Sequence, residues 1–445
     1  MDLNDFTINY NLKKRKYFHI ILPLFIASVI AYLDRVNVAY AALTMNVDMG
    51  FTAQIFGMGA GIFFLGYFLF EVPGAIIAEK YSPRIWVARI MISWGIVCGL
   101  MAFMTSVTEF YVYRFLLGAC EASFYPVVYA VIIPRWFNTE ERPKAISVML
   151  TSMLLSGIIG SPLAGWLLGV PLFGLKGWQV LFFLESIPAV VFGIILIYWL
   201  ADWPKDAKWL SLAEQVMLTE EYDKEIAAKN SVKKYTLWQA FRDKEVIKLC
   251  GIYFMWITGF WGFNFWMPTV LKSVSGWSNA AIGWVVVIPM TVTLITLVLV
   301  GNSSSRTGEK RWHAAAPLFL GAVGMGLGPF VTDPIMSLIL VCASAVGVYS
   351  GMGVWWTYPT SFLSGPAAAG AIGLINSIGN AGGWFGPYLT GYIKDLTGSF
   401  QWAYVYLAFS LTVAGLLILT LRKDLPTSVS TTSDSDAIEC LQETS

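Results

Sequence analysis

Long apolar runs separated by polar breaks dominate the chain. An α-helix needs about 20 apolar residues to cross about 30 Å of hydrocarbon, and twelve runs approach or exceed that length. The pattern therefore predicts twelve membrane-spanning helices. The predicted spans are residues 18–43, 53–78, 86–105, 109–134, 145–169, 178–201, 247–271, 279–300, 312–331, 336–361, 367–393 and 401–421.

One polar break is much longer than the others and separates two sets of six spans. It is rich in charge, as at Glu220, Glu221 and Lys224, which is typical of an amphipathic or partly disordered linker. The predicted segments are an N-terminal segment 1–17, a six-helix half 18–201, a central loop 202–246, a second six-helix half 247–422 and a tail 423–445.

Positive charge is concentrated in alternate breaks, which predicts an orientation. Cytoplasmic loops of membrane proteins carry an excess of Lys and Arg. The basic breaks hold Lys13 to Lys16, Lys80 and Arg84, Arg135, Arg142 and Lys144, Arg306, Lys310 and Arg311, and Arg422 and Lys423. We predict that both termini and the central loop are cytoplasmic, in a multi-pass protein of the plasma membrane (the inner membrane in a bacterium).

Composition agrees with a lipid environment and excludes several classes of protein. Of the 445 residues, 57% are hydrophobic and 13% charged, whereas a soluble protein carries about 25% charged residues. A net charge of +1 excludes nucleic-acid binding, which needs a clustered basic surface. The five Cys are scattered, and His19 and His313 stand far apart. We predict no enzymatic activity, metal or organic cofactor, and a monomer that contacts lipid and a small solute.

Six charged residues interrupt the apolar runs of the first half. A charge at mid-bilayer costs at least about 2.5–3.5 kcal/mol, so such residues mark function unless they lie near a helix end. They are Asp34, Arg35, Glu71, Arg114, Glu121 and Glu185. We interpret Glu71 as a structural or gating contact near the cytoplasm, and we do not assign Glu185 to the substrate.

The spacing of these charges predicts which of them share a helix face. Asp34 and Arg35 are adjacent and point about 100° apart, so each addresses a different partner. Arg114 and Glu121 are seven residues apart, share a face, and lie about 10 Å apart along the axis, which excludes a direct ion pair. Asp34 and Arg35 are compatible with two interpretations: a proton-binding carboxylate beside a substrate-binding guanidinium, or an ion network that joins helices. Arg114 and Glu121 each address another helix or a water-filled cavity, and a carboxyl such as Glu121 in a medium of low dielectric constant suits a site that gains and loses a proton.

The second half carries amides and aromatic rings where the first half carries charge. Candidates for substrate contact are Asn264 and Trp355 in the seventh and tenth spans, and Asn376 and Asn380 in the eleventh. Asn376 and Asn380 are four residues apart and share one face. A buried amide needs hydrogen-bond partners, and these could be hydroxyl groups of a substrate or other helices in a Gly-rich seam.

Two basic turns stand at the same place in each half, and they carry a first resemblance. Gly74 to Arg84 follows the second span, and Gly301 to Arg311 follows the eighth. They resemble the cytoplasmic loop signature of the major facilitator superfamily, with Glu79 as the acidic residue of the first copy and Ser305 in its place in the second. The resemblance covers nearly the whole chain and implies an all-α fold with two parallel six-helix halves.

Three further strings resemble the anion:cation symporter family within that superfamily. They are Tyr32-Leu-Asp34-Arg35-Val-Asn37, Arg114-Phe-Leu-Leu-Gly118-Ala-Cys-Glu121 and Asn376-Ser-Ile-Gly-Asn380. The family includes sugar-acid, tartrate and hydroxyphenylacetate permeases. The resemblance implies proton-coupled uptake of an organic carboxylate. On that pattern Asp34 and Glu121 match the proton-binding carboxylates, Arg35 and Arg114 the basic residues of the site, and Tyr32, Tyr67 and Asn376 the polar positions on the substrate side.

We therefore expect proton symport of a small organic carboxylate, a sugar acid or a related organic anion, by alternating access, with protons as the coupling ion. Three alternatives remain. The chain could exchange one anion for another, which needs paired Arg but neither carboxylate. It could carry an aromatic acid, given its aromatic content. It could also be a sensor without transport, although the central loop has no recognisable signalling domain.

Overall fold

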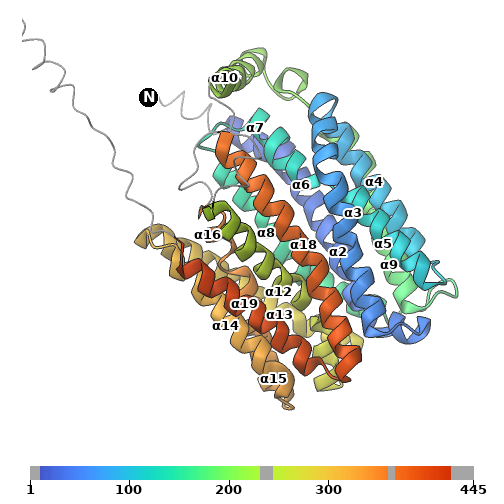
Figure 1. Cartoon of the computed structure of the whole chain (residues 1–445). Coiled ribbons are helices and arrows are strands. Elements are labelled where there is room, and N and C mark those ends of the chain that lie inside the picture. Colours follow the sequence, from blue (N-terminus) through green and yellow to red (C-terminus); the bar gives the residue numbers. More distant parts are fainter. Residues whose placement is uncertain (1–10, 231–243, 359–365, 422–445) are drawn as a thin grey trace, which may run out of the picture.

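The computed structural model describes residues 11–230, 244–358 and 366–421, and almost all of them are helical. The helices run side by side, with the first six on one side of the bundle and the last six on the other (Figure 1). The all-α class predicted from the apolar runs is confirmed. The predictions for residues 1–10, for residues 231–243 of the central loop and for the tail 423–445 lie outside the described residues.

The first half contains six spans, one of which is broken into short pieces. Its elements are η1 (Tyr17–Ile21), α2 (Leu22–Met49), α3 (Ala53–Lys80), α4 (Pro83–Met101), α5 (Val107–Glu121), α6 (Phe124–Pro126), η2 (Val127–Ile132), α7 (Ile133–Trp136), α8 (Arg142–Leu167) and α9 (Gly177–Trp199). Side chains of Thr52, Ser82 and Ser106 accept hydrogen bonds from the first turns of α3, α4 and α5. These bonds satisfy backbone N–H groups that lack partners at a helix start.

The second half repeats this arrangement with long helices. Its elements are α12 (Lys244–Ser275), α13 (Asn279–Thr307), α14 (Arg311–Leu327), η4 (Gly328–Phe330), α15 (Pro334–Tyr349), α16 (Met352–Trp355), α18 (Pro366–Thr397) and α19 (Phe400–Leu419). Within the described ranges, eleven helical segments are long and apolar enough to cross a membrane. The Gly-rich α18, with 32 residues, packs along both α3 and α12 and is the twelfth long helix.

The predicted fourth span, 109–134, is not one continuous helix. α5 ends at Glu121, and Ser123 then takes a left-handed backbone conformation with φ of 72°. Trp86 of α4 donates a hydrogen bond to the Ser123 hydroxyl at 2.9 Å. The chain continues through α6, η2 and α7. The break therefore places the Glu121 carboxyl at a helix end.

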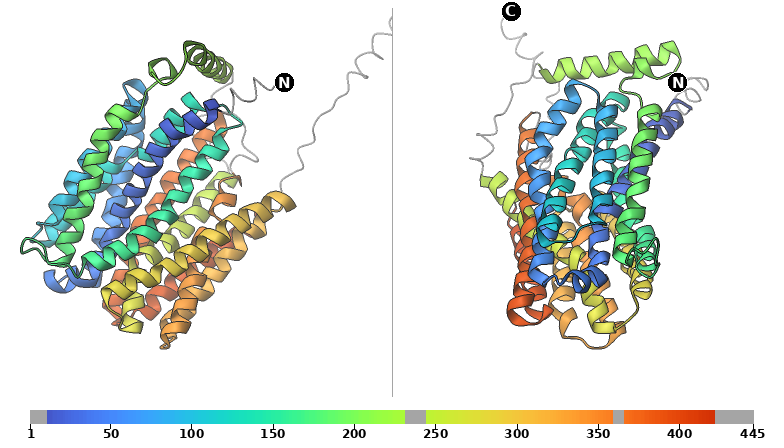
Figure 2. Two further views of the ribbon diagram at one scale, coloured as in Figure 1. Left: turned by 180° about the vertical axis from the view of Figure 1, so that it is seen from behind. Right: turned by 90° about the vertical axis from the view of Figure 1, so that its right-hand side faces the viewer.

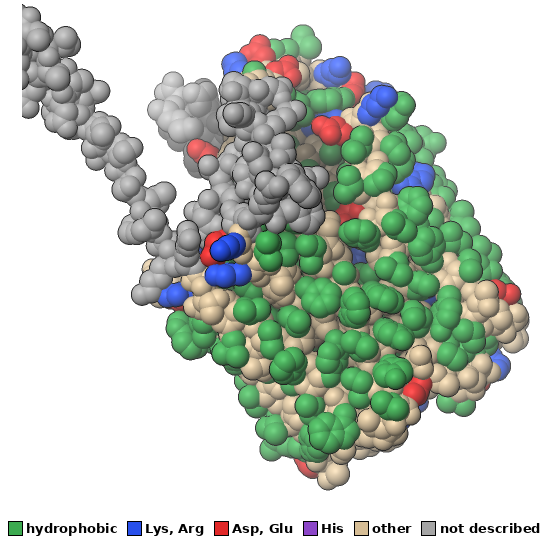
Figure 3. Space-filling view, viewed as in Figure 1, with side chains coloured by type: hydrophobic (Ala, Val, Ile, Leu, Met, Phe, Trp, Pro, Cys, Tyr) green, Lys and Arg blue, Asp and Glu red, His purple; other side chains and the backbone are tan. Residues whose placement is uncertain are grey.

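The central loop contains a short helix η3 (Pro204–Asp206) and a longer helix α10 (Leu212–Asn230). α10 lies across one end of the bundle (Figure 2). Two ion pairs hold it there, one between Arg15 and Glu214 and one between Arg142 and Glu225. In the view of Figure 3, charged side chains gather mostly near the two ends of the molecule, and hydrophobic side chains cover the region between them.

The halves meet closely at the end of the bundle opposite α10, which we call the outer end. On one side of it α3 packs against α18, and on the other α8 packs against α13. Glycines permit these approaches: a Cβ at Gly57 would collide with the carbonyl of Pro387, and one at Gly283 with the carbonyl of Ser161. The structure is therefore closed at its outer end.

Candidate functional site

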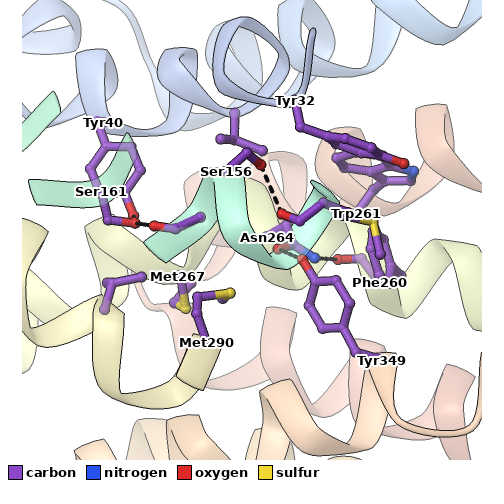
Figure 4. A pocket seen from close by; sticks show the side chains of 14 residues that line it. Tyr32, Tyr40, Ser156, Ser161, Phe260, Trp261, Asn264, Met267, Met290 and Tyr349 are labelled. Carbon is purple, nitrogen blue, oxygen red and sulfur yellow. Dashed lines mark hydrogen bonds between the residues drawn. The ribbon is translucent and has the colours of Figure 1, made fainter. Parts of the chain in front are cut away.

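A small cavity lies between the two halves, near the middle of the bundle. Polar and aromatic side chains line it: Tyr32 and Tyr40 from α2, Ser161 from α8, Trp261 and Asn264 from α12, and Tyr349 from α15 (Figure 4). Its volume is about 30 Å³, which is room for one or two water molecules. The cavity must widen before it can hold an organic solute.

Hydrogen bonds fix the polar groups of this wall. Asn264 accepts a hydrogen bond from the Tyr349 hydroxyl at 2.7 Å and donates one to the Phe260 carbonyl at 2.7 Å. The Tyr40 hydroxyl donates to the Ser161 hydroxyl at 2.6 Å. Tyr32 and Asn264, both predicted as site residues, therefore lie in the cavity wall. Tyr40 was not predicted, although it lies eight residues after Tyr32 on the same face of α2.

Arg35 and Glu121 form a buried ion pair beside the cavity. Both residues are at most 6% exposed. The guanidinium carbon of Arg35 lies 5.2–5.9 Å from the centroids of five aromatic rings: Tyr32, Phe63, Tyr67, Tyr125 and Trp261. Ring faces attract a cation at these distances. Tyr32 and Trp261 also line the cavity, so these two rings contact both the Arg35 guanidinium and the cavity.

Asp34 points to a different neighbour, as its 100° offset from Arg35 predicts. One carboxylate oxygen accepts a hydrogen bond from the Trp94 indole at 2.6 Å, and the other lies 3.8 Å from the Cys98 sulfur. Both partners belong to α4. Asp34 therefore lies in the interior of the first half and does not line the cavity.

Arg114 is fully buried and contacts the backbone of α3. Its Nε donates to the Gly59 carbonyl at 3.0 Å, and its Nη2 donates to the Ala60 carbonyl at 3.2 Å. Arg114 and Glu121 address different helices, as their spacing predicts. The structure thus places the anion-binding candidate Arg35 next to the cavity, and the second candidate, Arg114, against a neighbouring helix.

The remaining predicted residues surround the ion pair or lie farther from the cavity. Tyr67 is one of the five rings around Arg35. Asn376 donates a hydrogen bond to Glu71 at 3.2 Å, and Asn380 lies beside the same carboxyl. Trp355 is fully buried, stacks on Tyr253 and is not among the cavity-lining residues. Glu71 thus links the two halves, in agreement with a structural or gating contact.

Metal ligands do not gather anywhere in the described ranges: they contain no group of three or more His, Cys, Asp or Glu that could hold an ion. The site instead offers one buried guanidinium, one buried carboxyl paired with it, and a wall of hydroxyl, amide and aromatic groups. That combination can exchange one carboxylate partner of the guanidinium for another.

A bundle of twelve long apolar helices with a polar cavity between its halves defines a membrane transporter. The family model of the Major Facilitator Superfamily matches residues 24–383 and 276–440, and the chain belongs to that superfamily. It is therefore a multi-pass membrane transporter and not an enzyme.

Relatives and solved structures agree with this assignment. A protein of Agrobacterium vitis named "Putative tartrate transporter" is 40% identical over 93% of this chain and 92% of its own length. The "Quinolone resistance transporter" of Acinetobacter baumannii is 36% identical over 90% of this chain and 92% of its own. A bacterial homologue of the human lysosomal transporter Spinster, solved in an inward-facing and occupied conformation, has the same fold, with a TM-score of 0.70, 16% identity, and coverage of 91% and 94%. The resemblance to tartrate and sugar-acid permeases agrees with the first of these names.

Proposed function

We propose that the protein takes up a small organic carboxylate of the tartrate or sugar-acid class together with protons. The observation that carries the proposal is the buried ion pair between Arg35 and Glu121, whose guanidinium packs on two rings of the cavity wall, Tyr32 and Trp261. A carboxylate substrate needs a cation, and a guanidinium binds a carboxylate through two parallel hydrogen bonds. The tartrate transporter of Agrobacterium vitis supports the choice of substrate class.

Coupling follows from competition for one guanidinium. While Glu121 is ionised, it occupies Arg35, and a second carboxylate would add an unpaired charge to a buried site, which is costly. A proton on Glu121 removes its charge and releases Arg35 to the substrate. Asn264, Tyr349 and Tyr32 then supply hydrogen-bonding groups for the substrate's hydroxyls. Loaded with substrate and proton, the two halves rock, and the site opens to the other side.

Orientation is part of the proposal. The basic breaks between spans support a cytoplasmic location for both termini and for α10, with the outer end facing away from the cytoplasm. On this assignment the protein lies in the bacterial inner membrane and works as a monomer, because the cavity lies between its own two halves.

Uptake into proteoliposomes tests the proposal against anion exchange. We expect an inward proton gradient to drive accumulation of L-tartrate, or of a sugar acid where tartrate is not carried. A protonophore should abolish that accumulation without abolishing exchange of labelled for unlabelled substrate. Uptake that ignores the gradient but requires an internal anion would instead establish exchange, and uptake of aromatic acids alone would change the substrate class.

A further inference from the structure

A chain of five buried polar residues lies inside the first half, away from the cavity. It consists of Asp34 and Asn37 of α2, Trp94 and Cys98 of α4, and Glu185 of α9, and we call it the α2–α4–α9 cluster. Glu185 is 6% exposed and the other four at most 2%. The family resemblance implies a proton-binding role for Asp34, and the function proposed above leaves Glu185 without a role.

The cluster is continuous from Asp34 to Glu185. Asp34 and Asn37 are three residues apart on α2 and share a face. The Trp94 indole and the Cys98 thiol contact the two oxygens of Asp34. The Asn37 amide lies 3.8 Å from the Cys98 sulfur and is adjacent to the Glu185 carboxyl, and the same sulfur lies 3.8 Å from the Phe182 carbonyl of α9, one turn before Glu185. Two carboxyls on different helices are thereby connected through one amide and one thiol.

Neither carboxyl has a cation to neutralise it. Among the described residues, no Lys, Arg or His lies within ion-pair distance of Asp34 or Glu185, and Oε2 of Glu185 has no hydrogen-bond partner. The other charged or titratable groups that face the cluster are Arg114, whose charge acts on Cys98, Glu121, which acts on Asp34, and the Tyr40 hydroxyl, near Glu185. Arg114 is already hydrogen-bonded to α3.

Two like charges buried in one polar cluster of low dielectric constant repel each other, and interacting groups of this kind titrate as a pair. We propose that Glu185 is a positioning residue for the proton site at Asp34, so that the two carboxyls form one coupled proton-binding unit inside the first half. The proposal rests on the proton coupling proposed above. It assigns this unit to protons alone, because neither residue lines the cavity.

Infrared titration of the purified full-length protein in nanodiscs tests the pair without a substrate. Protonated carboxyl groups absorb in a region free of other protein bands, so their loss can be followed with pH. We expect Glu185→Gln to shift the titration midpoint of the Asp34 band by about one pH unit, and Asp34→Asn to shift that of Glu185. Midpoints that stay unchanged in both variants would overturn the proposal.

Transport measurements separate coupling from a structural role. In proteoliposomes we expect Glu185→Gln to move the pH profile of gradient-driven tartrate uptake to lower pH by a similar amount. The substrate concentration that gives half-maximal exchange should stay within twofold, and Glu185→Asp should restore the wild-type profile. A uniform loss of uptake and exchange at every pH would make Glu185 structural. If wild-type uptake ignores the gradient, the proposed function fails, and the infrared titration still decides the pair.

Discussion

The buried guanidinium of Arg35 contacts one carboxylate and five aromatic rings. The aromatic rings pack around the guanidinium of Arg35, and its N–H groups remain able to bond Glu121. Within the described residues, Nε of Arg35 has no hydrogen-bond partner. A buried donor without a partner is costly. A substrate carboxylate that accepted a hydrogen bond from this Nε–H group would remove that cost.

Removing the charge of Glu121 should uncouple binding from protons. We expect Glu121→Gln to bind substrate at least as tightly as the wild type at neutral pH, because Arg35 no longer has a competing anion. The variant should exchange substrate but lose most of its accumulation under a proton gradient, because one of the two proposed proton sites is gone. Parallel exchange and gradient-driven uptake assays measure this, with the exposed Glu140→Gln as a control.

Normal accumulation by Glu121→Gln would make that carboxyl structural. Loss of both exchange and accumulation with an unchanged melting temperature would place Glu121 among the groups that bind the substrate directly.

Substitutions of Arg35 and Arg114 should have different effects. We expect Arg35→Gln to abolish carboxylate binding while the protein remains folded. Arg114→Gln should lower stability, because it removes two charge-assisted bonds to the carbonyls of Gly59 and Ala60, each worth about 1.5–3 kcal/mol. Thermal unfolding with and without substrate separates the effects: substrate should no longer stabilise the first variant, but should still stabilise the second. Unchanged substrate affinity in Arg35→Gln would remove that residue from the site.

Sequence spacing predicted the directions of these side chains but not all their partners. Adjacent charges 100° apart had to reach different neighbours, as Asp34 and Arg35 do. That Arg114 binds backbone carbonyls could not be predicted, because a carbonyl carries no sequence signal and the residues it belongs to, Gly59 and Ala60, are apolar. Trp94 was missed for a related reason: one Trp among 19 is not distinguishable from an interfacial anchor.

At the scale of helices, the contact between α3 and α18 joins the two halves along much of its length. Glu71 receives the amide of Asn376 at one level. At the outer end Asp395 of α18 accepts hydrogen bonds from the backbone N–H groups of Ala53 and Gln54, at 3.1 and 2.7 Å. A carboxylate of one half therefore caps the N-terminus of a helix in the other. These bonds must break when the outer end opens.

Weakening this cap should favour the outward-open state. An anion at a helix N-terminus contributes about 0.3–1 kcal/mol at an exposed site, so we expect Asp395→Asn to raise the outward-open population by up to about fivefold. Spin labels at the exposed positions Val47 and Leu396, on either side of the contact, report the change as a longer distance.

Asp333 provides a matched control for that experiment. It caps α15 within one half, through the Met336 N–H at 2.7 Å, so Asp333→Asn should leave the distance distribution unchanged. An unchanged distribution in Asp395→Asn as well would show that the cap contributes nothing to outer closure.

Helix positions were predictable and helix interruptions were not. Apolar runs predict spanning helices, because a segment that crosses the membrane must satisfy its backbone hydrogen-bonding groups within itself. The break after Glu121 depends on the Trp86 indole and on Gly74, where a Cβ would collide with the Ser123 hydroxyl. Both lie far away in the sequence, and Ala122-Ser123 by itself does not indicate the end of a helix.

For the whole molecule, closure at the outer end and a cavity of about 30 Å³ describe one state of a cycle. The first half supplies the buried charges, and the second supplies Asn264, Tyr349 and Trp261 to the wall of the cavity. This division was visible in the sequence because charge within a span is rare. The size of the cavity was not, because it depends on how closely the two halves approach.

The number of carried protons determines how the membrane potential acts on the whole transporter. In the proposed mechanism Glu121 supplies one proton site, and the unit formed by Asp34 and Glu185 supplies a second. Two protons neutralise a divalent acid such as tartrate, so its uptake should not respond to the potential. With a monovalent sugar acid the same two protons carry one positive charge inward, which 100 mV, negative inside, favours by about 2.3 kcal/mol, or roughly fiftyfold in accumulation.

Proteoliposomes with a potassium diffusion potential and no pH gradient measure this difference directly. We expect a negative internal potential to drive accumulation of the monovalent acid and to leave tartrate at equilibrium. Tartrate driven out by the same potential would show that a single proton is carried, which would leave only one of the two sites active in transport. Tartrate driven in would require a third proton. Because Glu71 links the halves through Asn376, Glu71→Gln is the variant that would then test where that proton binds.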